Sequence, residues 1–219
     1  MGVEINLLEN YPKTKRDTKA RLQSKKKEDI EKAREFGKEF FDGSRDQGYG
    51  GFTYNPRFWQ PVIPSFKKFY NLNQKSSVLD VGCAKGFMLH DFITLIPGIK
   101  VAGIDISEYA IKESMHSIKN NVDVGNACNL NFEDNSFDLV ISITTVHNLD
   151  KTECIRALKE IQRVSINNSF ITVDAYSNEF EKKQMFSWNL TAKTILHVDD
   201  WLSLFHKAGY KGDYYWFKP

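Results

Sequence analysis

From residue 76 onward, short apolar runs rich in β-favouring residues alternate with segments whose apolar residues recur at helical spacing. The predicted strands read "SVLDVG", "KVAGID", "VDVGNA", "FDLVISIT", "SFITVDAY" and "GDYYWF". Helical patterns cover 86–96, 107–118, 151–163 and 199–208. Most of the strands are continuously apolar, as expected when helices cover both faces of a parallel sheet. The pattern predicts an α/β fold, a doubly wound and mostly parallel sheet of six to seven strands with helices on both faces.

The first 75 residues have a different character. Segment 25–43 is amphipathic, with Ile30 and Phe40 on one apolar stripe, and predicts a helix that docks on the domain. The stretch that follows is rich in glycine, proline and aromatic residues, and predicts an ordered loop that is either packed or a lid. We therefore expect an N-terminal helical cap and lid segment at 1–75 and a main domain at 76–219.

Polar residues mark the expected starts of the helices in the main domain. Ser107, Asp150 and Asp199 stand where helix N-caps are expected. The glycine of "AGYKGD" stands where the last helix is expected to end.

The composition fits one large domain with a buried core, since 41% of the 219 residues are hydrophobic. No apolar run approaches the length of a membrane span, and the N-terminus lacks the apolar core of a signal peptide, so we expect a cytoplasmic protein. Cys83, Cys128 and Cys154 are widely separated, which favours neither disulfides nor a metal site. The formal net charge of +2 requires no nucleic acid or membrane partner. Acidic residues within the basic run Lys13–Lys27 favour a solvated helix face over a phosphate-binding surface.

The stretch "SSVLDVGCAKGFMLHDF" places the Asp80 carboxylate beside small residues where the first predicted strand turns into a helix. A glycine-rich turn at such a place lets a ligand approach the main chain. The dinucleotide pattern GxGxxG is not matched, and Asp80 would repel a pyrophosphate while attracting a cation. The ligand is therefore expected to carry positive charge at this end.

A second acid, Asp105, ends the second predicted strand, 25 residues after Asp80. An acidic side chain at this place takes the two hydroxyls of a ribose. A cationic group joined to a ribose indicates S-adenosylmethionine, which has an ammonium, a sulfonium and an adenosine but no phosphate. In the alternative interpretation each acid only caps the helix after it. The strand, the helix and the second acid in register favour the ligand.

Residues 76 to about 175 resemble a class I S-adenosylmethionine-dependent methyltransferase. "VLDVGCAKG" is similar to the first motif of that family, with Ala84 in place of a frequent middle glycine, and "GIDIS" is similar to the second. "VGNACNLNFEDNSFDLVISITTVHNL" resembles the third and fourth motifs. Asn126 stands at the usual aspartate that reads the adenine amino group, and its amide oxygen can accept the same hydrogen bond. A turn role is the open alternative for Asn126.

The resemblance implies a Rossmann-like fold with S-adenosyl-L-methionine as methyl donor and S-adenosyl-L-homocysteine as product. The residues it implies in cofactor binding are Asp80, Gly82, Cys83, Ala84, Gly86, Asp105, Ile106, Asn126, Ala127 and Thr144. Most members end the sheet with two further strands, the last one reversed. Here either "TILHV" is one of that pair or the sheet is a strand short, and we expect the N-terminal helix or a second subunit to cover such an edge.

Methyl transfer is an in-line displacement that chiefly needs alignment of the reactants, and a base is required only for a hydroxyl or a charged amine. His147 follows the fourth predicted strand, at the ligand end of the sheet, where the family often has a histidine. We predict that His147 is the catalytic base, with packing as the open alternative. The sequence "TTVHN" at this place lacks the Asn/Asp-Pro-Pro-aromatic motif, so base nitrogens and glutamine amides are not expected acceptors.

Residues that bind the acceptor are expected in the segments that must cover the crevice. The predicted set is Tyr11, Tyr54, Arg57, Tyr176 and Trp188. Packing is the alternative for each of them, and Trp59 continues a helical stripe that favours packing. The loop "YNPRFW" is weakly similar to small methyltransferases that act on bacterial surface sugars.

The sequence therefore predicts an enzyme, an S-adenosylmethionine-dependent methyltransferase acting on a hydroxyl or amine of a small polar metabolite. A sugar or sugar nucleotide in bacterial surface polysaccharide synthesis is the leading acceptor. A protein or RNA methyltransferase and a noncatalytic cofactor-binding subunit are the alternatives. No GxSxG, HExxH or clustered metal-ligand pattern favours hydrolytic or metal chemistry. We expect a monomer or homodimer without a nucleic-acid partner.

Overall fold

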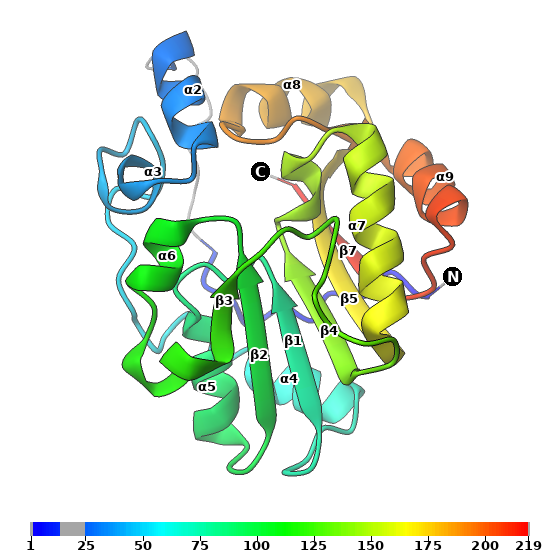
Figure 1. Ribbon diagram of the computed structural model, residues 1–219. Coiled ribbons are helices and arrows are strands. Elements are labelled where there is room, and N and C mark those ends of the chain that lie inside the picture. Colours follow the sequence, from blue (N-terminus) through cyan, green and yellow to red (C-terminus); the bar gives the residue numbers. More distant parts are fainter. Residues whose placement is uncertain (1, 14–24, 219) are drawn as a thin grey trace.

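The computed structural model describes residues 2–13 and 25–218, and most of the basic run Lys13–Lys27 lies outside them. Its centre is a seven-stranded sheet in the order β3-β2-β1-β4-β5-β6, with β7 pairing with β5 (Figure 1). The strands are β1 (Ser77–Val81), β2 (Lys100–Asp105), β3 (Val122–Val124), β4 (Phe137–Ile143), β5 (Ser165–Tyr176), β6 (Leu196–His197) and β7 (Asp213–Phe217). The described strands all pair in parallel, which confirms the predicted doubly wound sheet.

Helices cover both faces of the sheet. They are α2 (Lys27–Arg34), α3 (Lys38–Asp42), α4 (Ile63–Phe69), α5 (Phe87–Leu95), α6 (Glu108–Lys112), α7 (Lys151–Val164), α8 (Glu179–Trp188) and α9 (Val198–Ala208), with short 3-10 helices η1 (His116–Asn121) and η2 (Val146–Asn148). Leu79 of β1 packs with α7 and α9, whereas the preceding residue, Val78, packs with α4 and α5 on the opposite face. This alternation gives one core cluster on each side of the sheet.

Two of the three predicted helix N-caps are present. Ser107 caps α6, and Asp150 forms a capping box with Glu153 at the start of α7. The third prediction is wrong by two residues: His197 caps α9 by accepting the Asp199 N–H. Asp199 lies instead in the first helical turn, where a carboxylate interacts favourably with the helix dipole.

Two helices, α2 and α3, stand where the sequence pattern predicted a single amphipathic helix. The chain leaves the helical conformation between α2 and α3, where Phe36 has a φ of +51°. Both helices lie beyond the carboxyl ends of the strands, opposite α8 (Figure 1). By contrast, Ile63 and Phe66 of α4 are fully buried in the core, and the Phe66 ring lies 5.2 Å from that of Phe170. Only part of segment 1–75 therefore forms a cap, because α4 belongs to the main core.

The edge of the sheet beside β7 is covered by the beginning of the chain. Ile5 N–H donates to the Tyr214 carbonyl at 2.9 Å, and Tyr214 N–H donates to the Val3 carbonyl at 3.1 Å. The segment "TILHV" supplies only the two-residue β6, and β7 runs parallel to β5 rather than reversing. The N-terminal segment, not a helix, thus satisfies the hydrogen bonds of this edge.

None of the helices in the described ranges is long and apolar enough to cross a membrane.

The covering segment is held by Asp213, whose carboxylate accepts hydrogen bonds from Val3 N–H at 2.8 Å and from the Tyr70 hydroxyl at 2.9 Å. We expect Asp213→Ala to lower the free energy of unfolding by about 1–3 kcal/mol, because both donors lose their acceptor. Hydrogen exchange of the Ile5 amide should become faster. Tyr70→Phe, which removes one of the two bonds, is the control and should have a smaller effect. Unchanged exchange at Ile5 in Asp213→Ala would contradict this account of the edge.

Candidate active site

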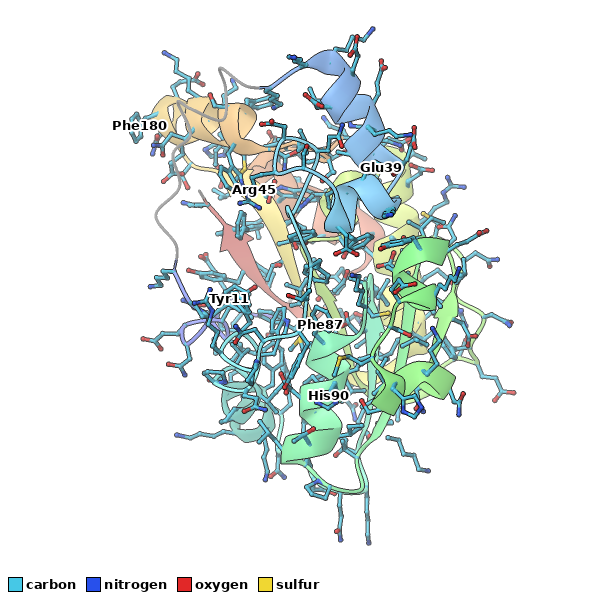
Figure 2. The ribbon with its side chains drawn as sticks, turned by 90° about the vertical axis from the view of Figure 1, so that its left-hand side faces the viewer. Tyr11, Glu39, Arg45, Phe87, His90 and Phe180 are labelled. Carbon is cyan, nitrogen blue, oxygen red and sulfur yellow. The ribbon has the colours of Figure 1, made fainter. Side chains whose placement is uncertain are left out.

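A cavity of about 1310 Å³ lies at the carboxyl ends of the central strands. Residues that end β1, β2, β4 and β5 form its floor, and the cap helices, the following loop and the segment after α8 form its walls. The N-terminal segment 2–13 adds a further wall, which Tyr11 marks in Figure 2, while Arg45 marks the loop after the cap helices. In an open parallel sheet this is the crevice where ligands bind.

The turn between β1 and α5 brings the main chain to the surface of this cavity. Gly82 has a φ of +91°, and a Cβ here would lie 2.1 Å from Thr145 Oγ1, so no larger residue fits. Ala84 has a φ of +50°, and its N–H donates to Asp105 Oδ2 at 2.8 Å. This left-handed conformation favours glycine, so the alanine is held in strained backbone beside the cavity.

Two buried carboxylates face the same cavity from neighbouring strands. Asp105 accepts hydrogen bonds from Ala84 N–H and, at 2.9 Å, from Ser107 N–H. Within the described part of the chain, no hydrogen-bond donor lies against the Asp80 carboxylate. Burial, together with the nearby Asp105, raises the pKa of Asp80 to about 8. Burial also raises the pKa of Asp105, while its backbone hydrogen bonds oppose that rise. Such a pair is best satisfied by a ligand that brings positive charge and hydrogen-bond donors.

The residues after β2 and β3 give the cavity an apolar wall with one polar position. Ile106 is 56% exposed and lines the cavity, so a flat apolar ring would cover a side chain that is otherwise open to water. Asn126 lines the same wall, and its Oδ1 accepts the Cys128 N–H at 2.8 Å. The turn role foreseen for Asn126 is therefore present. Its side-chain amino group and a second lone pair on Oδ1 still allow it to contact a ligand.

Most of the predicted site residues come together in this one cavity. Those that line it are Asp80, Gly82, Cys83, Ala84, Asp105, Ile106, Asn126, Ala127, Thr144, His147, Tyr11 and Trp188. Gly86 does not. It starts α5 with a φ of +73°, and a Cβ there would lie 2.4 Å from Ile118 Cδ1, so its role is to begin the helix and pack closely.

Three predicted acceptor residues lie outside the lining. The Tyr54 hydroxyl donates to Asp91 Oδ1 at 2.6 Å, which turns the ring toward α5. The exposed Arg57 guanidinium lies 4.7 Å from the centre of the Phe58 ring. Tyr176 packs beside the His197 ring, with centroids 5.7 Å apart. Each of these side chains is engaged in a contact that the sequence pattern did not reveal.

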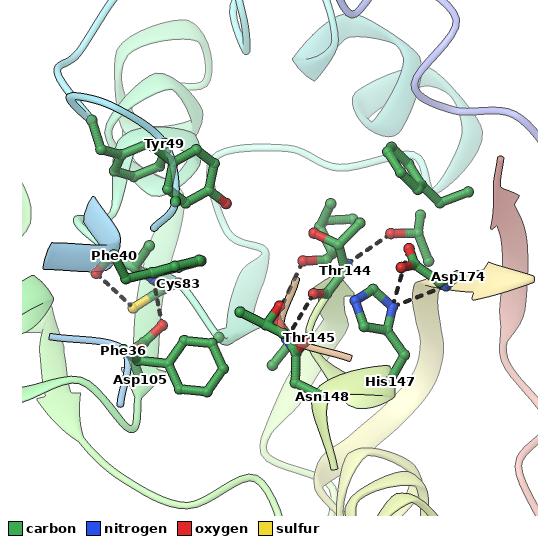
Figure 3. Close-up of a pocket in the computed structure, with 18 of the residues that line it drawn as sticks. Phe36, Phe40, Tyr49, Cys83, Asp105, Thr144, Thr145, His147, Asn148 and Asp174 are labelled. Carbon is green, nitrogen blue, oxygen red and sulfur yellow. Dashed lines mark hydrogen bonds and ion pairs between the residues drawn. The ribbon is translucent and has the colours of Figure 1, made fainter. Parts of the chain in front are cut away.

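His147 is held in a way that differs from the predicted base. The side chain is only 4% exposed, and its Nδ1 accepts the Asp174 backbone N–H at 2.9 Å (Figure 3). Burial lowers its pKa, and the Asp174 carboxylate opposes that effect. The ring is therefore neutral, with its one lone pair used by the backbone and its proton on Nε2. In this arrangement His147 presents a hydrogen-bond donor to the cavity rather than a proton acceptor.

Sequence reasoning missed several polar residues of the cavity. They include Thr145, Asn148, Asp174, Asn189 and Lys193. Asp174 ends the apolar run of β5 as Asp80 and Asp105 end those of β1 and β2, so the same pattern would have indicated it. Asn189 and Lys193 follow α8, and only the tertiary structure brings that segment to the cavity.

The cap is fastened to the turn after β1 by a partly buried ion pair. Lys85 Nζ lies 2.6 Å from Asp42 Oδ2, with the two side chains 8% and 23% exposed. Asp42 also accepts the Tyr109 hydroxyl at 2.7 Å and the Phe52 N–H at 2.9 Å. Burial alone would raise the pKa of Asp42, but the hydrogen bonds from Lys85, Phe52 and Tyr109 outweigh it and lower the pKa to about 2.

On its other side the cap reaches the segment that follows α8. Arg34 of α2 donates to the Thr191 carbonyl at 3.3 Å and to the Ala192 carbonyl at 3.1 Å. Lys25 donates to the carbonyl oxygens of Phe186 and Asn189. The cap thus bridges the two sides of the cavity.

Asp42→Asn is expected to lower the free energy of unfolding at pH 7 by about 1.5–3 kcal/mol, since Lys85 loses its charged partner. Because the folded-state pKa lies below the ordinary value, this contribution is present at neutral pH and is lost as the pH falls toward about 2. Urea unfolding of both proteins across this range measures the effect, and hydrogen exchange of Phe52 reports it locally. Asp46→Asn, at an exposed position in the next loop, is the matched control. A stability difference that does not depend on pH would contradict the assignment.

Comparison with known proteins places this geometry in a family. Residues 78–168 match the family model described as a methyltransferase domain. The demethylmenaquinone methyltransferase of Symbiobacterium thermophilum is 33% identical over 160 residues, which are 69% of this chain and 62% of that protein. The chain thus spans about three fifths of the length of this curated relative.

Two solved structures share the fold at low sequence identity. The YcgJ protein of Bacillus subtilis superposes with a TM-score of 0.53 at 19% identity, over 67% of this chain and 66% of that one. Phosphoethanolamine N-methyltransferase 2 of Haemonchus contortus, solved with phosphomonomethylethanolamine and S-adenosylhomocysteine, gives a TM-score of 0.58 at 18% identity, over 81% of this chain and 44% of that one. Residues 78–168 thus match a methyltransferase domain, and the parallel sheet, the glycine turn and the pair of strand-end acids are the features expected of a class I S-adenosylmethionine-dependent methyltransferase.

Proposed function

We propose that this protein transfers a methyl group from S-adenosylmethionine to a hydroxyl or amine of a small polar molecule. The observation that carries the proposal is one cavity that joins two sets of residues. Asp105 stands at one side, and the buried pair His147 and Asp174 stands at the other, with Thr144 between them (Figure 3). Asp80 lies on β1, which pairs with the strand that ends at Asp105. A cofactor at the first end would meet an acceptor at the second.

The residues at the cofactor end fit S-adenosylmethionine. Asp80 would accept from the ammonium and Asp105 from the ribose hydroxyls, while Ile106 would cover the adenine ring. Gly82 leaves room for the chain of the cofactor beside the backbone. When bound, the cofactor supplies a methyl group activated by the sulfonium. The protein contributes alignment and exclusion of water, which are worth about 7–11 kcal/mol in favourable systems.

A small acceptor is favoured over a protein or RNA by the cap that bridges the cavity through Asp42 and Arg34. A sugar or sugar nucleotide is our leading acceptor. Aromatic side chains on the walls, among them Tyr11, Trp59 and Trp188, offer flat apolar faces for the C–H face of a sugar ring. The same faces and the demethylmenaquinone methyltransferase relative make an aromatic quinol a second candidate.

The proposal is tested by incubating the protein with S-adenosylmethionine and a panel of sugars, nucleotide sugars and quinols, and measuring S-adenosylhomocysteine. Release that depends on an acceptor, with a methylated product identified by mass spectrometry, is the expected result. Tight cofactor binding without turnover on any acceptor would indicate a noncatalytic binding subunit instead. Calorimetry of Asp105→Ala should give at least tenfold weaker cofactor binding, as charge-assisted hydrogen bonds are worth about 1.5–3 kcal/mol. The control is Asp123→Ala, at an exposed acid on β3.

Asp80→Asn is expected to stabilise the free protein while weakening cofactor binding. The pKa of about 8 lies above the ordinary value, so folded Asp80 holds a proton that the unfolded chain releases. Its contribution to stability therefore declines as the pH rises from about 4 to about 8, and the variant should melt at a higher temperature at pH 8. A cationic ligand would favour the carboxylate, so wild-type binding at pH 7 should release protons, measured by calorimetry in buffers of different ionisation heat. Equal proton release by Asp80→Asn would refute this role.

A further inference from the structure

The acceptor end of the cavity holds a donor beside an acceptor, both fixed by the fold. His147 uses Nδ1 to accept the Asp174 N–H, so Nε2 carries the ring proton. The residue lines the cavity with a side chain that is only 4% exposed, and no hydrogen bond of Nε2 is present within the described residues. When a bound ligand excludes water from the cavity, this N–H is satisfied only if the ligand supplies an acceptor. His147 thus points to an oxygen or another acceptor atom in the ligand.

Asp174 is anchored through both its main chain and its side chain. Its carbonyl accepts the Trp201 Nε1–H at 2.9 Å, and its backbone pairs with Phe217 of β7. The Asn189 side-chain amide donates to the carboxylate, and Asn189 Oδ1 in turn accepts the Ala192 N–H at 2.7 Å. The Asp174 side chain is therefore a rigid carboxylate at the end of β5.

The two groups lie next to each other. Asp174 Oδ1 is 3.5 Å from His147 Nδ1, and both residues line the cavity near Thr144 (Figure 3). A ligand here meets a carboxylate that accepts and an imidazole N–H that donates. An acceptor molecule with two oxygens can pair one of them with each group.

A carboxylate at this place treats hydroxyls and amines differently. It stabilises an amine in its ammonium form, which has no lone pair to attack a methyl group. A hydroxyl that donates to the carboxylate keeps its lone pairs and becomes more nucleophilic as its proton moves away.

On the basis of the function proposed above, we propose that Asp174 accepts the proton of the reacting hydroxyl. His147 Nε2–H donates a hydrogen bond to an adjacent oxygen of the same methyl-acceptor molecule. The acceptor is then a polyol with neighbouring oxygens, and the atom methylated is oxygen. The hydroxyl oxygen forms a bond to the methyl carbon as the carbon–sulfur bond breaks. The electron pair of that bond stays on sulfur, giving S-adenosylhomocysteine, and the hydroxyl proton moves to the Asp174 carboxylate.

The first test needs no acceptor. Long-range ¹H–¹⁵N spectra of labelled protein report which ring nitrogen of each histidine carries a proton, and the His147 signals are those lost in His147→Gln. We expect the Nε2–H form at pH 7.5, both in the wild type and in Asp174→Asn, where the backbone N–H remains. An Nδ1–H or doubly protonated ring overturns the assignment.

The second test uses a panel of methyl glycosides and nucleotide sugars, each paired with its amino-sugar analogue. We expect O-methylated products, a fall in kcat of at least a hundredfold in Asp174→Asn, and at least tenfold lower kcat/KM in His147→Ala, with His147→Gln closer to wild type. Asp91→Asn is the matched control, because this carboxylate is fully buried on α5 outside the cavity.

Methylation of the amines alone, unchanged turnover in Asp174→Asn, or no turnover of any polyol overturns the inference. Calorimetry of cofactor binding distinguishes a failure of the Asp174 and His147 assignment from a failure of the proposed methyltransferase function. Intact binding with methylation of an amine or a quinol leaves a methyltransferase with a different acceptor, whereas lost binding removes the proposed function itself.

Discussion

The site depends on keeping two carboxylates out of water with no cation from residues 2–13 or 25–218 paired with them. Asp80 and Asp105 end adjacent parallel strands, so the sheet itself fixes their separation. Asp105 is compensated by backbone N–H groups, whereas Asp80 is compensated by nothing in the described residues. The fold therefore carries an electrostatic cost that a cationic ligand relieves. In the free protein this cost appears as the raised pKa of Asp80, about 8; a cationic ligand would favour its carboxylate form, whereas a pyrophosphate would not.

Two residues that line the same cavity have strained backbone. Ala84 adopts a left-handed conformation, and so does Thr144, directly after β4, with a φ of +53°. Neither residue type favours this conformation, so the surrounding structure must hold both in place. At Ala84 the holding contact is the hydrogen bond to Asp105. The Asp105 carboxylate, which lines the cavity, thus also shapes the turn beside it.

The cap gives the cavity its upper boundary and connects its two ends. The Asp42 and Lys85 pair fastens α3 to the glycine turn, and Arg34 fastens α2 to the segment after α8. The segment that bears Asn189 also orients Asp174. Movement of the cap would therefore shift both the glycine turn and the segment that holds Asp174. A closed cap would exclude water from the cavity.

The sequence by itself determined the parallel sheet, the order of its elements and the two acids that β1 and β2 bring to the cavity. These follow from local signals: continuous apolar runs, capping residues and an acid at the end of a strand. It also indicated His147, whose role as a base stays a prediction, but it did not reveal the hydrogen bond that its Nδ1 accepts. Which nitrogen of a histidine carries the proton depends on its neighbour, here the backbone of Asp174, which lies 27 residues away.

Only the tertiary structure decided the rest of the site. It turned Tyr54 toward Asp91, brought Asn189 to Asp174, and laid the start of the chain against β7. These outcomes rest on contacts between segments that are far apart in the chain, so no periodicity or motif encodes them. The residue type at the end of each strand can be read from the sequence, because it depends only on that position. What each group donates to or accepts from is set by packing, because a hydrogen bond needs both partners in place.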